Sequence, residues 1–249
     1  LRKWLEDEKH GEMEWLNRNV DVRLDPRNLV EGAASVICVA DRYGKLEEEP
    51  LCARDGRIAR YARGRDYHKE MKKRLHSISD ALREEFPGEQ FRACVDTAPL
   101  LEREFAQRAG IGSVGKHTLL IEQGIGSWML LGVIVTTAEL EYSEHDQTDP
   151  CGTCTRCIDA CPTDAITPWS VDARACISYL TIEHRTEIAP GRYASMGDWM
   201  FGCDICQEVC PHNQPSEREA SSQLNEAYSP SLRSLHVLEV LHWDSDARR

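Results

Sequence analysis

The stretch DPCGTCTRCIDACPTDAI, residues 149–166, constrains the structure of this chain more than any other part of its sequence. Its four cysteines follow the spacing C-x2-C-x2-C-x3-C, with a proline after the last; they are Cys151, Cys154, Cys157 and Cys161. In chains with this spacing, three thiolates hold one [4Fe–4S] cluster and the fourth binds a second cluster. The motif therefore predicts a second copy elsewhere in the chain.

The second copy is MFGCDICQEVCPHN, residues 200–213, in which Met200 occupies the place of the first cysteine. The second cluster thus lacks one ligand, and Cys176 is the only cysteine between the two motifs. The predicted ligands are Cys151, Cys154, Cys157 and Cys210 for the first cluster, and Cys161, Cys176, Cys203 and Cys206 for the second. Tetrahedral zinc is the alternative for a single C-x2-C pair, but two interlocked motifs are far more specific for clusters.

The distribution of the cysteines indicates where the protein works. Eight of the eleven lie between residues 151 and 210, which favours metal binding in a reducing cytoplasm over a secreted disulfide scaffold. The others, Cys38, Cys52 and Cys94, lie in or near predicted strands, and we expect small buried residues there.

No apolar run reaches the roughly 18 residues of a membrane span, so we expect no membrane association. The chain starts at Leu1 without a signal-peptide pattern, and we expect residues to be missing before it.

The charge distribution leaves two interpretations open. The net charge of −12 argues against a nucleic-acid partner, yet residues 54–74 hold nine Arg or Lys and three acidic residues. This basic run is either a solvated helix face or a patch that contacts phosphates. In the second interpretation, the candidate nucleic-acid contacts are Arg60, Arg63 and Lys72.

Hydrophobic periodicity predicts an α/β (α+β) domain over residues 1–145. We expect strands at 34–40 and 91–95, helices at 2–19, at 57–86 with a break at Gly64 and at 99–110, and two strands flanking residues 124–126. A polar segment ending at Pro150 separates a cysteine-rich domain, 146–215, and a helical tail follows at 216–249. The sequence GIGSVG, residues 110–115, matches a dinucleotide fingerprint, but a helix precedes it and a strand follows. We therefore interpret it as a helix stop and a loop.

Two clusters in series form an electron relay, so the first domain should contain an electron acceptor, for which flavin and corrinoid are both candidates. The chain resembles the epoxyqueuosine reductase family in segments that occur in order from His10 to Asn213. They are HGEMEWL, YARGRDYHKEMKKRL, VDTAPLLEREFAQRAGIGSVGKHTLLI, CGTCTRCIDACPTDAI, YLTIEH and GCDICQEVCPHN. The resemblance implies a domain that holds base-off cobalamin, followed by a ferredoxin-like domain with two [4Fe–4S] clusters.

The resemblance also implies a reaction. The clusters would deliver electrons from an external donor to form cob(I)alamin, which would open the epoxide of epoxyqueuosine at the tRNA wobble position and yield queuosine and water. We expect a cytoplasmic, monomeric enzyme. A corrinoid reductive dehalogenase is a second enzyme with the same cofactors, and a ferredoxin-type electron carrier is an alternative from another class.

Asp96 in CVDTAPL matches the family's proton donor. From the residues alone, Asp96 fits better as the N-cap of a helix that begins near Pro99. The residues that resemble cobalamin contacts are Tyr67, His68, Asp96, Gly115, Lys116, His117, Thr118, His184 and Arg185. Lys116 would meet a propionamide or phosphate. For the histidines and Arg185, an ordinary surface or packing role is an equal alternative.

Overall fold

The computed structural model describes residues 1–45, 52, 54–143, 148–214 and 224–242. Its main sheet has the antiparallel order β1-β6-β3, formed by β1 (Ser35–Arg42), β6 (Met129–Thr136) and β3 (Phe91–Cys94). Strand β6 is central, and its sequence MLLGVIVT is apolar or β-branched at most positions because both of its faces are covered.

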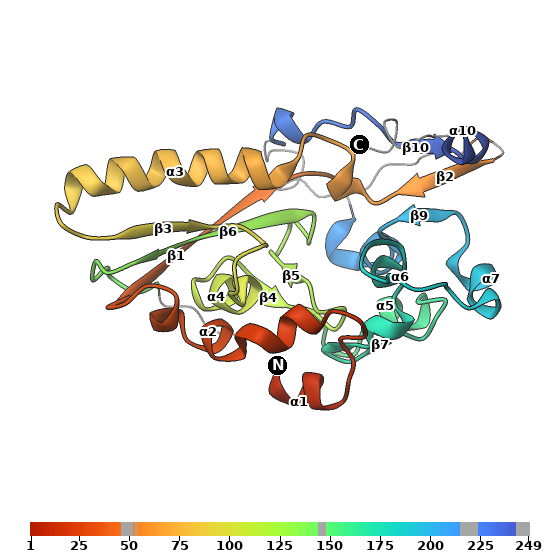
Figure 1. The fold of residues 1–249 in the computed structure, drawn as a ribbon, viewed down its shortest axis with the longest axis horizontal. Coiled ribbons are helices and arrows are strands. Elements are labelled where there is room, and N and C mark those ends of the chain that lie inside the picture. The colour runs from red at the N-terminus through yellow and green to blue at the C-terminus, as the bar shows by residue number, and fades with distance from the viewer. Residues whose placement is uncertain (46–51, 53, 144–147, 215–223, 243–249) are drawn as a thin grey trace.

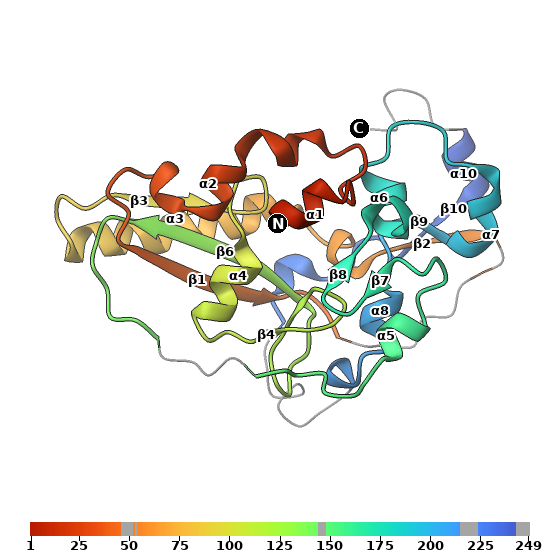
Figure 2. The same cartoon turned by 90° about the horizontal axis from the view of Figure 1, so that it is seen from below.

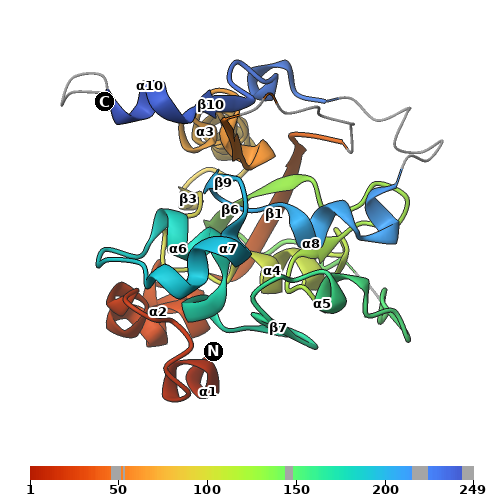
Figure 3. The ribbon, with the colours of Figure 1, turned by 90° about the vertical axis from the view of Figure 1, so that its right-hand side faces the viewer.

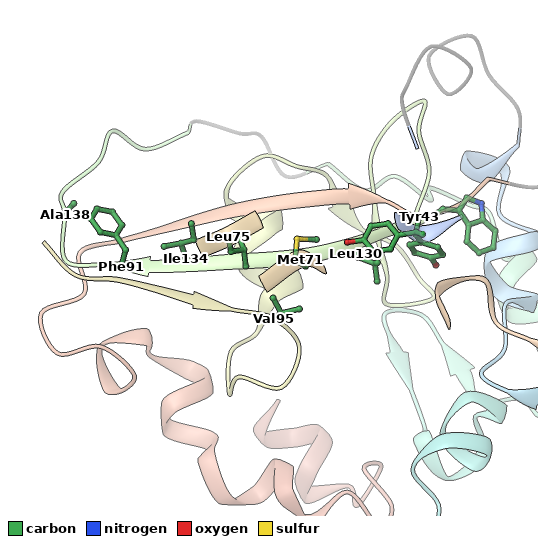
Figure 4. Packing of buried hydrophobic residues seen from close by; sticks show 10 residues of the cluster. Tyr43, Met71, Leu75, Phe91, Val95, Leu130, Ile134 and Ala138 are labelled. Atoms are coloured by element: carbon green, nitrogen blue, oxygen red, sulfur yellow. The ribbon is translucent and has the colours of Figure 1, made fainter. Parts of the chain in front are cut away.

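Helix α3 (Tyr67–Glu85) covers one face of this sheet, and α4 (Glu102–Arg108) covers the other (Figure 1). Met71 and Leu75 of α3 lie one turn apart and are fully buried against β6. They join Tyr43, Phe91 and other side chains in a hydrophobic core that runs along the sheet (Figure 4). This core positions the N-terminal end of α3 and the C-terminal end of β3, which carry the candidate site.

A second sheet, of order β10-β2-β9, joins segments that are far apart in the sequence. It consists of β2 (Asp55–Ile58), β9 (Trp199–Phe201) and β10 (Ser234–His236), with β2 parallel to β9 and antiparallel to β10. Each of the three predicted domains contributes one strand to it. The predicted domain boundaries at residues 145 and 215 lie outside the described residues.

The cysteine-rich region is built from short elements connected by turns (Figure 2). They are α5 (Arg156–Asp159), β7 (Ile166–Thr167), β8 (Ser170–Val171), α6 (Ile177–Ile182), α7 (Tyr193–Met196) and α8 (Ile205–Glu208). Helices α5 and α8 follow equivalent positions of the two thiol motifs and contact each other. The remaining short elements are α1 (Arg2–Glu6), α2 (Val20–Leu24), β4 (Ser113–Val114), β5 (Leu120–Ile121) and α10 (Val237–Leu241). Figure 3 shows α10 and β10 on the side opposite α1.

Several sequence predictions are confirmed. The strands at 34–40 and 91–95 are β1 and β3. Helix α4 stops at Gly110, whose φ of 82° and backbone hydrogen bonds from Gly110 N–H to Gln107 and from Ile111 N–H to Ala106 form a Schellman-type end. Strand β4 follows directly, so the glycine-rich stretch is a helix stop and a loop.

Other predictions are wrong. Residues 55–58 form a strand, not the start of a helix, because the apolar positions of that segment are buried by pairing with β9. Residues 2–19 form only the short α1 and a 3-10 turn at 14–19. In the predicted helical tail, the described residues form a 3-10 turn, strand β10 and a helix of five residues. Among the described residues, no helix combines the length and apolar character that crossing a membrane requires.

Candidate functional site

The first thiol group lies where α5 meets the chain that follows α8. Burial raises the pKa of Cys157, and the neighbouring thiols of Cys151, Cys210 and Cys154 raise it further. Burial also raises the pKa of Cys210, and the thiols of Cys151 and Cys154 act in the same direction. These four side chains line a small cavity together with His117 and His212. The structure therefore brings together the four residues that the sequence predicts as ligands of one cluster.

The second thiol group draws its four members from three segments of the chain. Burial raises the pKa of Cys203 to about 12, and the thiols of Cys176 and Cys161 act in the same direction. Burial raises the pKa of Cys206 well above its ordinary value, and the thiols of Cys203 and Cys176 act in the same direction. Cys161 of the first motif thus lies with the second group, and Cys210 of the second motif lies with the first. Two sets of four thiols match the number of cysteine ligands that two [4Fe–4S] clusters require.

Met200 and Cys176 explain how the second group is completed. Met200 lies in β9 and packs against Gly56 of β2, where a Cβ atom would lie 1.9 Å from the methionine sulfur. Cys176 precedes α6, and backbone N–H groups of Tyr179 and Ser178 hydrogen-bond its sulfur and partly offset the pKa increase that burial causes. Within the described residues, no three His, Cys, Asp or Glu side chains are arranged to hold a single metal ion.

Lys116 points towards the first thiol group. Its backbone N–H donates to Cys151 Sγ at 3.3 Å, and its ammonium donates to the carbonyls of Gly152 and Cys154 at 2.7 and 2.9 Å. These contacts differ from the propionamide or phosphate contact that the sequence predicts, because the ammonium is turned under the cysteine loop. Gly115 packs against Ile121, where a Cβ atom would lie 2.5 Å from Cδ1.

His117 is buried beside the same cavity. Burial lowers its pKa to about 4, with smaller contributions from Arg103 and His212, so the ring is neutral near pH 7. Its Nδ1 accepts the Leu119 N–H at 3.1 Å, so the proton of the neutral ring is on Nε2, and that atom has no hydrogen-bond partner among the described residues. A buried donor next to four thiols fits a site whose missing acceptor is a cluster sulfur. The adjacent Thr118 has a φ of 69°, and its carbonyl accepts from Arg103 at 2.5 Å.

Asp96 lies in the turn after β3, on an open face of the protein. Its side chain is 58% exposed, and its Oδ2 is 3.1 Å from Nε2 of His68, whose Nδ1 is 2.9 Å from Asp66. Burial alone would lower the pKa of His68, but the hydrogen bonds with Asp96 and Asp66 raise it above the ordinary value. Three side chains therefore form a hydrogen-bonded chain that ends at the exposed carboxylate.

The N-cap interpretation of Asp96 is wrong. Helix α4 starts at Glu102 with Leu101 as its N-cap, so Asp96 lies several residues before it. Instead, the Asp96 N–H donates to the Glu102 carboxylate at 2.6 Å, which holds Asp96 at a φ of 45°. Burial raises the pKa of Glu102 to about 7, although this hydrogen bond opposes the increase.

An aromatic surface adjoins Asp96. The His68 ring stacks on Tyr67 with ring centroids 4.0 Å apart, and Tyr61 contacts both Tyr67 and Phe201. Burial and the nearby Asp96 raise the pKa of Tyr67, so its hydroxyl stays protonated. Phe201 is 38% exposed. An exposed aromatic surface edged by hydrogen-bonding groups fits the apolar face of a flat macrocycle such as a corrin.

His184 and Arg185 lie just after α6 and contact an N-terminal loop. His184 Nδ1 is 3.4 Å from the Glu12 carboxylate, and the Arg185 N–H donates to it at 2.6 Å. The Arg185 side chain is 76% exposed. Neither residue lies on a helix surface, and both fix the position of the loop that packs on Tyr179.

The structure corrects two of the three predicted tRNA contacts. Arg60 is buried, donates to Asp204 through its backbone N–H at 2.7 Å and to Glu208 through its guanidinium at 2.6 Å, and stacks over Trp128. Arg63 is 2% exposed and donates to the Ile58 carbonyl at 2.7 Å. Both therefore stabilise the fold and cannot reach a phosphate. Lys72 is exposed on α3 and stays a prediction.

Sequence reasoning missed Asp66 and Glu102. Asp66 accepts the His68 N–H at 3.1 Å as the N-cap of α3, and an Asp two residues before a predicted helical His could have indicated this. No local pattern identifies Glu102, because its contact with Asp96 depends on the turn between them. Of the remaining cysteines, Cys94 is buried as expected, Cys38 is partly buried, and Cys52 is exposed, contrary to expectation.

Comparisons with known proteins agree with this arrangement. Residues 23–97 match the family model described as epoxyqueuosine reductase QueG, DUF1730, and residues 150–213 match the 4Fe-4S double cluster binding domain. An epoxyqueuosine reductase of Cellulophaga algicola is 42% identical over 238 residues, which cover 94% of this chain and 76% of that protein. The corresponding protein of Xanthomonas campestris is 43% identical over 253 residues, covering 97% of this chain and 71% of that protein.

Solved structures agree as well. The crystal structure of an epoxyqueuosine reductase with an epoxyqueuosine-modified tRNA-Tyr stem loop has a TM-score of 0.87 and 27% identity, and covers 99% of this chain. A Bacillus subtilis epoxyqueuosine reductase, with its catalytic loop swung out of the active site, has a TM-score of 0.82 and 26% identity, and covers 92% of this chain. This chain spans 66% and 61% of the lengths of those two chains. These matches confirm the family resemblance that the sequence predicts.

Proposed function

Because the chain belongs to the epoxyqueuosine reductase family, we propose that it reduces the epoxide of epoxyqueuosine in the anticodon loop of tRNA to queuosine. The observation that carries this proposal is the exposed Asp96–His68 pair, beside an aromatic surface and within the same body as two groups of four thiols. A related enzyme has been crystallised with an epoxyqueuosine-modified tRNA stem loop, which supports the substrate. Such a substrate implies work in the cytoplasm.

The two thiol groups are the proposed ligand sets. Cys151, Cys154, Cys157 and Cys210 would hold the first [4Fe–4S] cluster; Cys161, Cys176, Cys203 and Cys206 would hold the second. The match of residues 150–213 to a double cluster domain supports this assignment. Cys157 and Cys210 are buried and the other six thiols are partly buried, which limits the access of water, and an external electron donor would supply the electrons.

The proposed cobalamin site is the aromatic surface formed by Tyr61, Tyr67 and Phe201, together with His68 and the loop that carries Thr118. When bound, cobalamin supplies a strongly reducing and nucleophilic cobalt centre. The residues of this chain position it and provide protons. His184 and Arg185 contribute by holding the Glu12 loop against α6.

Asp96 is the proposed proton donor. The reaction adds two electrons and two protons to the substrate: the C–O bonds of the epoxide break, and its oxygen leaves as water. Asp96 donates a proton to that oxygen. His68 hydrogen-bonds Asp96 on one side and Asp66 on the other, and it then returns a proton to Asp96. The turn that carries Asp96 is held by Glu102, and in the Bacillus subtilis relative the catalytic loop swings out of the active site.

The test is turnover by anaerobically reconstituted protein. The chain, loaded with iron and sulfide, should convert an epoxyqueuosine-containing tRNA stem loop to the queuosine form when cobalamin and a reductant are present, measured by mass spectrometry of the nucleosides. The reaction should stop when cobalamin is omitted. Reduction of the clusters with no conversion at any cobalamin concentration would indicate an electron carrier instead and refute the proposal.

A further inference from the structure

Lys116 lies outside the proposed proton-transfer groups, and the hydrogen bonds that it donates in the described structure all go to the loop that carries the first thiol group. Only 7% of it is exposed, and it sits at the turn between β4 and β5. Its ammonium donates to two carbonyls of the loop that carries Cys151 and Cys154, at 2.7 and 2.9 Å. Its backbone N–H donates to the sulfur of Cys151 at 3.3 Å. Charge and hydrogen bonding are thus both directed at the first thiol group.

Nothing acidic neutralises this charge within the described part of the chain, where Lys116 makes no ion pair. In the described structure, the ammonium also lies 5.6 Å from the ring centroid of Trp169, whose backbone N–H donates to the Lys116 backbone carbonyl at 3.1 Å. The indole therefore holds the ammonium in place without cancelling its charge. A buried and unpaired cation is costly, so a negative group at this site would stabilise it.

The second thiol group has a different electrostatic environment. Its buried charged neighbour is Asp204, which is 1% exposed and which accepts the Arg60 N–H at 2.7 Å. Arg60 and Asp204 are close enough to offset each other, with 3.5 Å between the guanidinium and the carboxylate. Among the described residues, Lys116 thus gives the first group a buried cation without an acidic partner, whereas the buried Arg60 near the second group is paired with Asp204.

We propose that Lys116 raises the reduction potential of the cluster held by Cys151, Cys154, Cys157 and Cys210. This inference rests on the proposed cluster ligation. Four thiolates outweigh the charge of the iron–sulfur core, so the whole site is an anion, and the one electron gained on reduction makes it more negative. Net charge and hydrogen bonds to sulfur are the principal protein-controlled determinants of such potentials. A cation held under the ligand loop stabilises the reduced state more than the oxidised state.

The experiment is a redox titration of the full reconstituted chain, followed by electron paramagnetic resonance. Lys116→Gln keeps a group that can donate to the two carbonyls but removes the charge. For this variant we expect an unchanged iron content and about a tenfold lower reduced-to-oxidised ratio of one cluster at fixed potential, which equals about 59 mV for a one-electron couple. The other cluster should not change. Cys176→Ala, which keeps the first thiol group intact, identifies the signal that belongs to the first cluster.

Three further variants, Lys116→Arg, Lys3→Met and Lys116→Met, complete the design. Lys116→Arg keeps the charge and should keep the potential, and Lys3→Met removes an exposed lysine of α1 and should change neither cluster. Equal potentials in wild type and Lys116→Gln at full iron content would overturn the inference. Loss of iron in Lys116→Gln and Lys116→Met alike would indicate a purely structural lysine and would also overturn it. These readouts need no tRNA, so a shifted potential without epoxide reduction would refute the proposed function while leaving this inference intact.

Discussion

The thiol groups and the Asp96 face of this protein differ in both burial and construction. Cys157 and Cys210 are buried, whereas the side chains of Asp96 and His68 are 58% and 40% exposed. Burial suits groups that hold a redox centre away from water, while a proton donor must come within hydrogen-bonding distance of its substrate. In the proposed function, the chain would therefore use a buried region for electrons and an open region for protons, so variants of the two regions should have separable effects.

The largest expected effect comes from Cys176→Ala, in the electron region. Removing the eighth thiol leaves the second group with three ligands, so iron should fall from about eight to about four per chain, and epoxide reduction should be lost. Iron analysis and nucleoside mass spectrometry measure the two outcomes. The exposed Cys52 provides the matched control, since Cys52→Ala should retain full iron. Retention of about eight irons in Cys176→Ala would remove Cys176 from the ligand set.

Asp96→Asn is the corresponding change in the proton region. An amide cannot donate a proton as a carboxylic acid does, so turnover should fall by about 10²- to 10⁴-fold while iron content and stem-loop binding stay unchanged. Single-turnover rates and binding isotherms test this separation. Asp80→Asn, at an exposed acid on α3, is the control and should behave as wild type. Equal turnover of Asp96→Asn and wild type would exclude Asp96 as the acid.

The third prediction concerns Arg60, which lies between the two regions. Arg60→Met leaves Asp204 buried without its guanidinium partner, and breaking a buried pair in this way costs about 3–5 kcal/mol of stability. Thermal unfolding of the iron-loaded protein should show a midpoint lower by roughly 10 °C. Lys72→Met should leave the midpoint unchanged and instead weaken tRNA binding and flatten its salt dependence. An unchanged midpoint for Arg60→Met would show that this buried pair contributes little to the stability of the fold.

The same contrast explains what could be predicted from the sequence. The thiol groups come from two short motifs with fixed spacing, and the need for an eighth ligand identifies Cys176 as the candidate because Met200 cannot replace it. The strands β1 and β3 were predictable because their apolar runs are local signals. Asp96 could be proposed only through the family resemblance, because its contacts with His68 and Glu102 are created by turns and by the packing of α3 and α4 on one sheet.

The failed predictions have a common physical cause. Arg60 and Arg63 belong to a basic run, but whether an arginine is exposed depends on which elements pack over it, and here β9 and α8 do so. Pairing between distant segments also made residues 55–58 a strand and joined the tail to the same sheet. Lys116 could be identified as a site residue, but its partner could not, since the direction of a side chain depends on the fold of its loop.

The smallest effect expected is a pH dependence that links Glu102 to the proton region. Its pKa rises from 4.5 to about 7 on folding, chiefly through burial, so between these values the folded state binds more protons than the unfolded state. The free energy of unfolding should therefore fall as pH rises from about 4.5 to 7, by about 1 kcal/mol once solvent screening is allowed for. Glu102→Gln should flatten this slope of stability against pH, and thermal unfolding between pH 5 and 8 measures the difference. A variant with the same slope as wild type would show that titration of the Glu102 carboxyl does not account for this pH dependence of stability.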